Sequence, residues 1–448
     1  MLLVARYVLP VSAPHIEDGA VLVRGGRIAE VGPAAELKAR HADEEVRDFG
    51  LAALLPGFVD THTHLEYTAF RGLVDDLPYS QWKMQVMSKE SALDAEDWED
   101  SAALGAVEAL GSGITTIADI TASGASARAA ARAGLRGIAY REVQTMEKAR
   151  VPEVMREAAA DVAKWRELSP GLLAAGIAPH APYSCHPELF VRAAEFASAE
   201  GLPVAIHLAG SKDEYDFVKY GSSPLAVDFV DETGWSDVGW LPTGVSPVRY
   251  VLQWRLFDLP DVLAVHCVQV DDADIEVLAD RGVAIAYCPR CNAKLGMGTA
   301  PLQKFLERGL RVGIGTDSPA SNNTVDEFDE MRIGLLIQRG MTGEAAFFTA
   351  EMFVRLATLD AARALGMGAE IGSLEAGKQA DIVAVDLSSS HQVPTQDPYG
   401  ALVHSANQES VLMTMVGGAV RYDRGEFATM DVERAIQRVE RMRAKLRG

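Results

Sequence analysis

Short apolar runs alternate with alanine-rich or amphipathic stretches through the middle of this chain. Helical patterns at residues 102–110, 126–133, 187–199 and 272–280 lie between apolar runs of strand length. Strands that alternate with helices predict βα units and a parallel sheet. The apolar runs number eight, and they end near His62, Asp119, Arg141, His180, His207, His266, Tyr287 and Asp317. We therefore predict an α/β protein with a (β/α)₈ TIM barrel, in which functional groups gather at the C-terminal ends of the strands.

Both ends of the chain show β patterns instead. Residues 20–24 and 27–31 are apolar or alternating around Gly25-Gly26, which is typical of a hairpin because glycine accepts positive φ. Similar runs near the C-terminus cover residues 380–385, 411–416 and 419–422. Because the termini of a domain often lie close together, the two ends can complete one sheet. We predict a composite β-sandwich domain from residues 1–55 and 373–448, and a barrel domain from residues 56–372.

Two further segments stand out from this alternation. Residues 215–259 are long for a βα connection and rich in Gly, Pro and Trp, which favours a loop that covers the substrate. Residues 432–446 are basic with a helical pattern, and we expect a surface helix there.

The net charge of the chain restricts which macromolecules it can bind. The 448 residues are 48% hydrophobic, carry a net charge of −21 and have a pI of about 4.9. So acidic a chain is a poor match for nucleic acid or an anionic membrane. No run approaches the roughly 18 apolar residues of a membrane helix, and the N-terminus lacks a basic leader pattern. We expect a soluble cytoplasmic protein.

Cysteine is scarce. Four cysteines are too few for a disulfide framework in a chain of this length. Cys288 and Cys291 have a CxxC spacing, but a structural metal site would need a second such pair. We interpret both as ordinary thiols at the end of a strand.

His62 and His64 stand two residues apart at the end of an apolar run. That spacing directs both side chains to one face of an extended strand, where they can hold one ion. Neutral imidazole suits zinc, iron, nickel or copper, and further ligands must come from elsewhere in the fold. His207, His266 and Asp317 each end an apolar run and are the candidates. A single such histidine is often a core residue, but four together predict a metal site.

Several motifs in order carry a family resemblance: PGFVDTHTHLEY at 56–67, VHCV at 265–268, CPRCN at 288–292, GTDSPASNN at 315–323 and IGSLEAGKQADIV at 371–383. With them the chain resembles the amidohydrolase superfamily over nearly its whole length. The resemblance implies one divalent metal, with zinc as the first expectation and Fe²⁺ or another ion as alternatives. It implies the ligands His62, His64, His207 and Asp317. No lysine ends the fourth strand, where two-metal relatives carry a carboxylated one, so a mononuclear site is expected.

A site of this kind serves hydrolysis. A metal with an open position lowers the pKa of bound water to about 7 and so supplies hydroxide at neutral pH. We expect Asp317 to accept a proton and pass it to a leaving amine, while His266 hydrogen-bonds the developing oxyanion. Hydrolytic deamination and hydrolysis of an amide-like bond both fit.

Within the superfamily the chain is similar to deaminases of adenine nucleosides, including methylthioadenosine/adenosylhomocysteine and aminodeoxyfutalosine deaminases. Residues 64–66, 70–72, 178–183 and 246–250 carry this similarity, with Trp82. It implies a small nucleoside-like substrate, first 6-amino-6-deoxyfutalosine, which would give futalosine and ammonia in menaquinone biosynthesis, and a homodimer is an expected assembly. The candidate substrate contacts, among them arginines that could pair with a carboxylate, are Glu66, Arg71, Trp82, Arg141, His180 and Arg249.

One position departs from these deaminases. They carry a glutamate three residues after the strand-five histidine, which protonates the purine ring, whereas this chain has Gly210. Glu214 is the nearest substitute and is a candidate catalytic acid. The alternatives are an enzyme that cleaves another carbon–nitrogen or carbon–halide bond without ring protonation, and a protein that binds a nucleoside without turnover.

Overall fold

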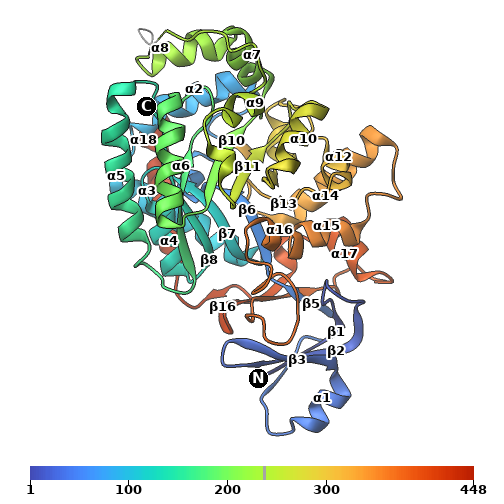
Figure 1. Ribbon diagram of the computed structural model, residues 1–448. Coiled ribbons are helices and arrows are strands. Elements are labelled where there is room, and N and C mark those ends of the chain that lie inside the picture. The colour runs from blue at the N-terminus through green and yellow to red at the C-terminus, as the bar shows by residue number, and fades with distance from the viewer. Residues whose placement is uncertain (236–238, 448) are drawn as a thin grey trace.

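The central body of the computed structural model is an eight-stranded parallel barrel, and the model describes residues 1–235 and 239–447 (Figure 1). Its strands follow one another in sequence order around the sheet. Nearly every strand residue is buried, which explains why these strands appear in the sequence as continuous apolar runs. The strands are β6 (Phe58–Thr63), β7 (Ile114–Thr121), β8 (Arg136–Val143), β9 (Leu173–Pro179), β10 (Val204–Leu208), β11 (Val262–His266), β12 (Ala284–Tyr287) and β13 (Val312–Ile314).

Contacts between β6 and β13 close the barrel. The hydroxyl of Thr61 donates to the carbonyl of Ile314 at 2.7 Å, and the amide of Asp317 donates to the carbonyl of His62 at 2.8 Å. A parallel bridge also pairs Thr63 with Asp317. The first and last strands therefore bring two of the predicted metal ligands side by side.

Helices surround the barrel (Figure 1). Those of the first half are α2 (Tyr79–Glu90), α3 (Ala95–Gly111), α4 (Ala125–Ala133), α5 (Val151–Trp165) and α6 (Pro187–Glu200). Those of the second half are α10 (Asp272–Asp280), α11 (Pro289–Lys294), α12 (Leu302–Glu307), α13 (Pro319–Asn322), α14 (Glu327–Thr342), α15 (Ala350–Leu356) and α16 (Leu359–Ala364). Short helical turns are η1 (Leu65–Phe70) and η2 (Lys148–Arg150).

The two ends of the chain build one nine-stranded sheet beside the barrel, where Figure 1 shows blue and red strands together. β5 joins the halves, because it pairs with β1 in parallel and with β14 in antiparallel orientation. Leu3, Leu54, Ile382 and Met413 share one buried cluster. The predicted barrel with a composite domain is confirmed. Its strands are β1 (Leu2–Val8), β2 (Ile16–Arg24), β3 (Arg27–Pro33), β4 (Val46–Asp48), β5 (Ala52–Pro56), β14 (Ile382–Asp386), β15 (Val411–Val416), β16 (Ala419–Asp423) and β17 (Glu426–Phe427).

The basic C-terminal segment forms α18 (Val432–Arg447), which lies on barrel helix α3. Arg438 contacts Asp100 at 2.7 Å, and Lys445 contacts Asp97 at 2.5 Å. Met442 is buried in a cluster with barrel side chains. The remaining helical segments outside the insertion are α1 (Ala34–Arg40), α17 (Pro398–His404) and η5 (Gln408–Ser410). Across residues 1–235 and 239–447, no helix is both long and apolar enough to cross a membrane.

The insertion at residues 215–259 is largely helical, although residues 236–238 lie outside the described part of the chain. It contacts helix α2, and Phe229 packs edge-on against Tyr183 with ring centroids 5.3 Å apart. Its segments are the end of α7 (Lys212–Tyr220), then η3 (Leu225–Phe229), α8 (Val230–Glu232), α9 (Pro247–Leu252) and η4 (Leu256–Asp258). The insertion thus supports α2, the helix that contributes side chains to the cavity described next.

Candidate active site

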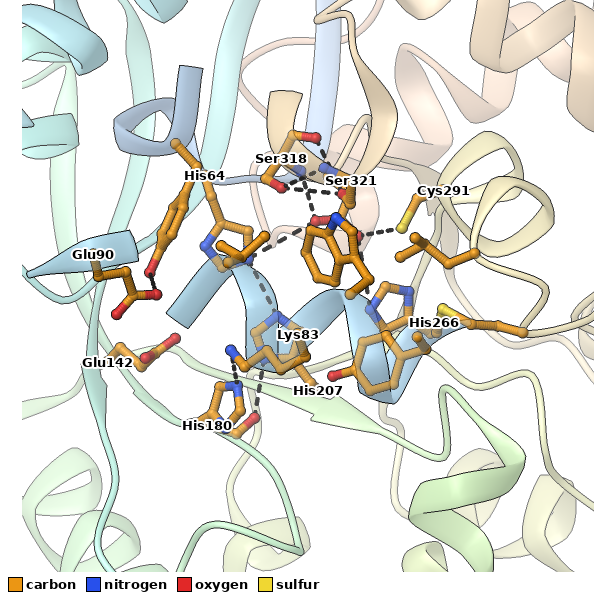
Figure 2. Close-up of a pocket in the computed structure, with 17 residues that line it drawn as sticks. His64, Lys83, Glu90, Glu142, His180, His207, His266, Cys291, Ser318 and Ser321 are labelled. Carbon is orange, nitrogen blue, oxygen red and sulfur yellow. Dashed lines mark hydrogen bonds and ion pairs between the residues drawn. The ribbon is translucent and has the colours of Figure 1, made fainter. Parts of the chain in front are cut away.

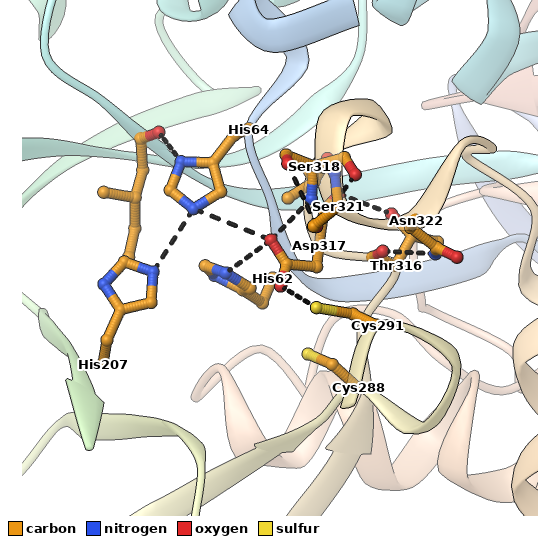
Figure 3. Close-up of polar contacts among 12 residues, drawn as sticks. His62, His64, His207, Cys288, Cys291, Thr316, Asp317, Ser318, Ser321 and Asn322 are labelled. Atoms are coloured by element: carbon orange, nitrogen blue, oxygen red, sulfur yellow. Dashed lines mark hydrogen bonds and ion pairs between the residues drawn. The ribbon is translucent and has the colours of Figure 1, made fainter. Parts of the chain in front are cut away.

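Four histidines and one aspartate converge at the C-terminal mouth of the barrel. Figure 3 shows three of the histidines, His62, His64 and His207, around Asp317. His64 Nε2 lies 3.3 Å from His207 Nε2. Asp317 Oδ1 lies 3.6 Å from His62 Nε2 and 4.0 Å from His64 Nε2. His266 Nε2 is 3.9 Å from the other oxygen of Asp317. The predicted ligands therefore form one group, although they come from distant parts of the chain.

The geometry of this group fits a metal ion. Both ring nitrogens of His62 are buried without a hydrogen-bond partner. Two nitrogens at about 2.0–2.1 Å from a tetrahedral zinc lie roughly 3.4 Å apart, close to the separation of His64 and His207. Their Nδ1 atoms donate to the carbonyls of Ile120 and His180, which turns each Nε2 toward the centre. Burial lowers the pKa of His64 to about 3, so the ring is a neutral ligand at pH 7.

The backbone at the mouth is unusual. His266, Cys267 and Asp317 have φ values of 75°, 47° and 60°, in the left-handed region that non-glycine residues seldom adopt. Such conformations cost of order 1–3 kcal/mol each and persist where the surrounding structure enforces them. Here they lie at the end of β11 and just after β13, and they turn the side chains of His266 and Asp317 into the same space.

Asp317 is held by two further donors. The amide of Ser318 donates to Oδ1 at 2.6 Å, and the thiol of Cys291 donates to Oδ2 at 2.7 Å. Burial alone would raise the pKa of Asp317, but the imidazoles of His62, His266 and His64 beside its carboxylate hold that pKa well below its usual range. Cys291 lines the site, which the CxxC spacing did not indicate because it does not give the direction of a side chain.

His266 is oriented by a neighbouring amide. Its Nδ1 donates to Oδ1 of Asn292 at 3.0 Å, so the lone pair of Nε2 faces Asp317. Burial lowers the pKa of His266 to about 4, and the ring is neutral at pH 7. In this tautomer Nε2 accepts a hydrogen bond; the oxyanion contact expected from the sequence needs a proton on Nε2 and stays a prediction.

A cavity opens beside the cluster (Figure 2). Its lining combines polar and apolar side chains, namely His64, Tyr67, Tyr79, Trp82, Lys83, Val86, Glu90, Glu142, His180, His207, His266, Cys291, Leu295, Met297, Asp317, Ser318 and Ser321.

Two predicted substrate contacts do reach this cavity. Trp82 is 8% exposed, and its indole Nε1 is buried without a hydrogen-bond partner. His180 Nδ1 donates to the hydroxyl of Ser184 at 2.6 Å, because that hydroxyl already donates to a carbonyl. His180 Nε2 then accepts from Lys83 Nζ at 3.5 Å. Trp82 is thus a free donor, and His180 has a fixed tautomer.

Lys83, Glu90 and Glu142 are cavity residues that the sequence reasoning missed. A signal existed for the first two, because Tyr79, Trp82, Lys83, Val86 and Glu90 follow helical spacing along one face of α2. For Glu142 the signal was strand alternation, since Ile138 and Tyr140 belong to the inner cluster and Glu142 follows at the same period.

The structure does not bring three predicted arginine contacts to the cavity. Arg71 pairs with Glu108, and Arg141 pairs with Asp161 of α5 at 3.0 Å. Arg141 precedes Glu142, so it points out of the barrel where Glu142 points in. Similarly, Arg249 does not line the cavity and pairs with Asp271 at 2.5 Å and Asp274 at 2.9 Å.

The carboxylate of Glu66 is also held away from the cavity. It accepts from the hydroxyls of Thr121 and Ser123, both at 2.5 Å, and from the amide of Ala122 at 3.0 Å. These partners connect η1 to the end of β7. Glu66 therefore organises the mouth of the barrel from behind the metal cluster.

Glu214 has a similar local role. Its two oxygens accept the amides of Ala209 and Gly210, each at 2.8 Å, and it does not line the cavity. Burial raises the pKa of Glu214 to about 7, while these amides oppose the shift. The carboxylate thus fixes the loop that follows His207. At Gly210 an added Cβ would lie 2.9 Å from Met297 Cε and 3.2 Å from His266 Cδ2.

Replacement of Glu142 by glutamine should change how stability depends on pH. Burial raises the pKa of Glu142 from 4.5 to about 7, with Lys83 opposing and Glu66 and Glu90 adding to the shift. A carboxyl with a raised native pKa binds more protons when folded, so wild-type stability falls as pH rises across this window. Compared with Glu142→Gln, the wild type should lose about 3 kcal/mol of unfolding free energy as the pH rises through this window, because one pKa unit corresponds to about 1.36 kcal/mol.

Urea denaturation of both proteins at about pH 4.5 and about pH 7.5 measures this difference. If the free energies of unfolding of the two proteins differ by the same amount at both pH values, the raised pKa of Glu142 is contradicted.

Comparison with protein families places these residues in a known context. Residues 53–421 match the family described as "Amidohydrolase family". Residues 19–43 match an imidazolonepropionase-like composite domain of bacteria. The first match spans the barrel and part of the composite sheet.

Individual relatives extend over the same length. A 5-methylthioadenosine/S-adenosylhomocysteine deaminase of Moorella thermoacetica is 36% identical over 433 residues, 95% of each chain. A 5'-deoxyadenosine deaminase of Methanosarcina mazei is 31% identical, covering 97% of this chain and 95% of its own. The crystal structure of an adenosine deaminase from Xanthomonas campestris with bound zinc superposes with a TM-score of 0.86. It is 30% identical and covers 100% of this chain and 98% of its own.

Proposed function

The chain belongs to the amidohydrolase family as a hydrolase of carbon–nitrogen bonds, and we propose that it removes the 6-amino group of an adenine nucleoside by hydrolysis. The observation that carries the proposal is the convergence of His62, His64, His207 and Asp317 beside a cavity lined by polar and aromatic side chains. Three relatives with deaminase names, matched over nearly the whole chain, support the same reaction.

The four ligands would hold one divalent metal. We propose zinc, because imidazole and carboxylate at these separations suit a tetrahedral site and because the Xanthomonas campestris structure contains it. When bound, the metal supplies a nucleophile at neutral pH and polarises the substrate. Glu142 and His180 also lie near His207, but we assign no second metal ion to these three residues.

Asp317 and His266 would move the protons. Asp317 is ionised at neutral pH and has one oxygen facing His62 and the other facing His266, so it can accept a proton from the attacking water. It can then deliver that proton to the departing amine. The unprotonated Nε2 of His266 accepts a hydrogen bond from the same water and orients it. Trp82 Nε1 is available to donate to a purine or ribose acceptor.

Charge in the cavity bears on the choice of nucleoside. The expected substrate 6-amino-6-deoxyfutalosine carries a carboxylate, and among the described residues that line the cavity Lys83 is the only lysine or arginine. Uncharged 5′-modified adenosines need no cation. We therefore propose methylthioadenosine and 5′-deoxyadenosine as the first substrates to test, with 6-amino-6-deoxyfutalosine as the anionic comparison.

A screen of the zinc-loaded protein tests the proposed function. Adenosine, methylthioadenosine, 5′-deoxyadenosine, adenosylhomocysteine and 6-amino-6-deoxyfutalosine should be followed by the adenine-to-hypoxanthine absorbance change and by ammonia release. We expect deamination of at least one uncharged nucleoside. Absence of ammonia from all five would overturn the proposal and favour hydrolysis of another carbon–nitrogen or carbon–halide bond. Sedimentation of the same sample tests the expected homodimer.

A further inference from the structure

The carboxylate of Glu142 lies free at the cavity wall. It projects from the end of β8, lines the cavity, and accepts no hydrogen bond from any residue in the described ranges (Figure 2). Glu90, by contrast, accepts from the hydroxyl of Tyr67 at 2.9 Å. Glu142 is partly buried and has no donor from the protein, so a ligand that donates a hydrogen bond to its carboxylate gains from that bond.

The charge near Glu142 is not balanced by the protein. Lys83 is directed to His180 Nε2 at 3.5 Å, and within the described chain it forms no ion pair with a carboxylate inside 4.0 Å. When both carboxyl groups are ionised, which for Glu142 requires a pH above its raised pKa of about 7, Glu90 and Glu142 together with Lys83 leave this wall with one formal negative charge. The three arginines considered from sequence are paired elsewhere.

A second metal ion is a poor match for the same residues. Glu142, His180 and His207 have potential ligand atoms within 4.8 Å of one another. However, Nδ1 of His207 donates to the carbonyl of His180, and its Nε2 faces His64. His207 therefore has no nitrogen left for another ion, and the ammonium of Lys83 lies against His180. An organic ligand is the better occupant.

The position of Glu90 and Glu142 in the cavity indicates which part of the substrate they would contact. Hydrolysis at the purine requires the amino-bearing carbon beside Asp317 and His266. Figure 2 shows Glu90 and Glu142 on the opposite side from His266 and Cys291. The ribose and its 5′ substituent would then extend toward Glu142.

We propose that Glu142 is a specificity-determining residue that favours nucleosides with a protonated amine on the 5′ side and disfavours those with a carboxylate there. The inference rests on the proposed function, because it assumes that a nucleoside enters with its purine at the metal cluster. A charge-assisted hydrogen bond to a carboxylate is about twice as strong as a neutral one, and a second carboxylate would be repelled.

Three adenosines of similar size test the charge preference: 5′-amino-5′-deoxyadenosine, 5′-deoxyadenosine and adenosine-5′-carboxylate. With the zinc-loaded protein, kcat/KM should be about tenfold to a hundredfold higher for the amine than for 5′-deoxyadenosine, the range of one charged hydrogen bond. The carboxylate should be the poorest of the three. Glu142→Gln should remove the preference for the amine, whereas Glu147→Gln, which removes an exposed carboxylate paired with Arg150, should retain it.

Dissociation constants for the same three nucleosides, measured by calorimetry, separate this inference from the proposed function. If none is deaminated the proposed function fails, while the order of binding still tests Glu142. Equal binding and equal rates for the three compounds in the wild type, or a preference for the carboxylate, would overturn the inference. A preference for the amine that persists in folded Glu142→Gln would also overturn it.

Discussion

Replacement of Asp317 by asparagine should lower kcat by at least about 10⁴-fold, because it removes the proposed proton acceptor and weakens a metal ligand together. A positioned acid or base typically contributes about 10²- to 10⁴-fold, and loss of the metal adds to that. The side chain is held by Ser318 and Cys291, so asparagine should occupy the same place with little change in fold. Initial rates on the best nucleoside, with elemental analysis of the protein, measure the effect.

Replacement of His62 by alanine tests the metal separately from the proton transfer. An open tetrahedral site with only three remaining ligands holds zinc poorly, so metal content should fall from about one equivalent per chain. Asp161→Asn is a matched control, because it removes a carboxylate that pairs with Arg141 outside the cavity. A His62→Ala protein with unchanged metal content and rate would refute the site. A wild-type content of about two equivalents would contradict a mononuclear centre.

The barrel and the metal cluster could be predicted because both depend on local patterns. Each strand is buried on both sides and therefore appears as an apolar run, and a polar residue that ends such a run must lie at the mouth. His62, His207 and Asp317 satisfy this rule, and the structure brings them together. Closure of β6 on β13 by Thr61 then places the first and last strands side by side.

The substrate side of the cavity was much less predictable. Arg141 and Glu142 are adjacent, and a shift of one residue decides which of them faces inward. Helical spacing places Lys83 and Glu90 on the same face of α2 as Trp82, but it does not indicate that this helix lies over the mouth of the barrel. Arg249 lies in the segment 246–250 that carries the deaminase similarity, yet Asp271 and Asp274 pair with it in the fold.

The sequence predicts Glu214 as an acidic group close to His207, but it does not predict the backbone amides that hydrogen-bond to its carboxylate. The sequence offered it as a substitute acid for the glutamate absent at Gly210. In the structure both of its oxygens accept backbone amides, and it stands outside the cavity lining. Glu214→Gln should therefore lower the free energy of unfolding by about 1–3 kcal/mol, since one buried amide loses its acceptor.

Replacement of Gly210 by glutamate should raise kcat on the preferred adenine nucleoside by about 10²- to 10⁴-fold, or roughly 2.7–5.5 kcal/mol in the barrier. The new carboxyl would arise three residues after His207, next to His266, where it can protonate the purine ring. Gly210 is not among the residues with positive φ, so its backbone accepts a side chain. The added Cβ requires a small shift of Met297 Cε, the flexible end of its side chain, and a shift of a few tenths of an ångström by the ring of His266, whose Cδ2 would lie 3.2 Å away.

Gly210→Gln is the control that decides the cause of this gain, because glutamine has the same shape and no acidic proton. The glutamate variant should be much faster than the glutamine variant, and the gain should appear in kcat more than in KM, since the proton is needed in the transition state.

Glu214→Gln should leave kcat within a fewfold of wild type if the carboxylate only fixes the loop. Equal rates for Gly210→Glu and Gly210→Gln, together with a tenfold or greater loss in Glu214→Gln, would instead make Glu214 the acid. If none of these variants changes the rate, ring protonation is not part of the reaction, and cleavage of a different carbon–nitrogen or carbon–halide bond becomes the better account of the site.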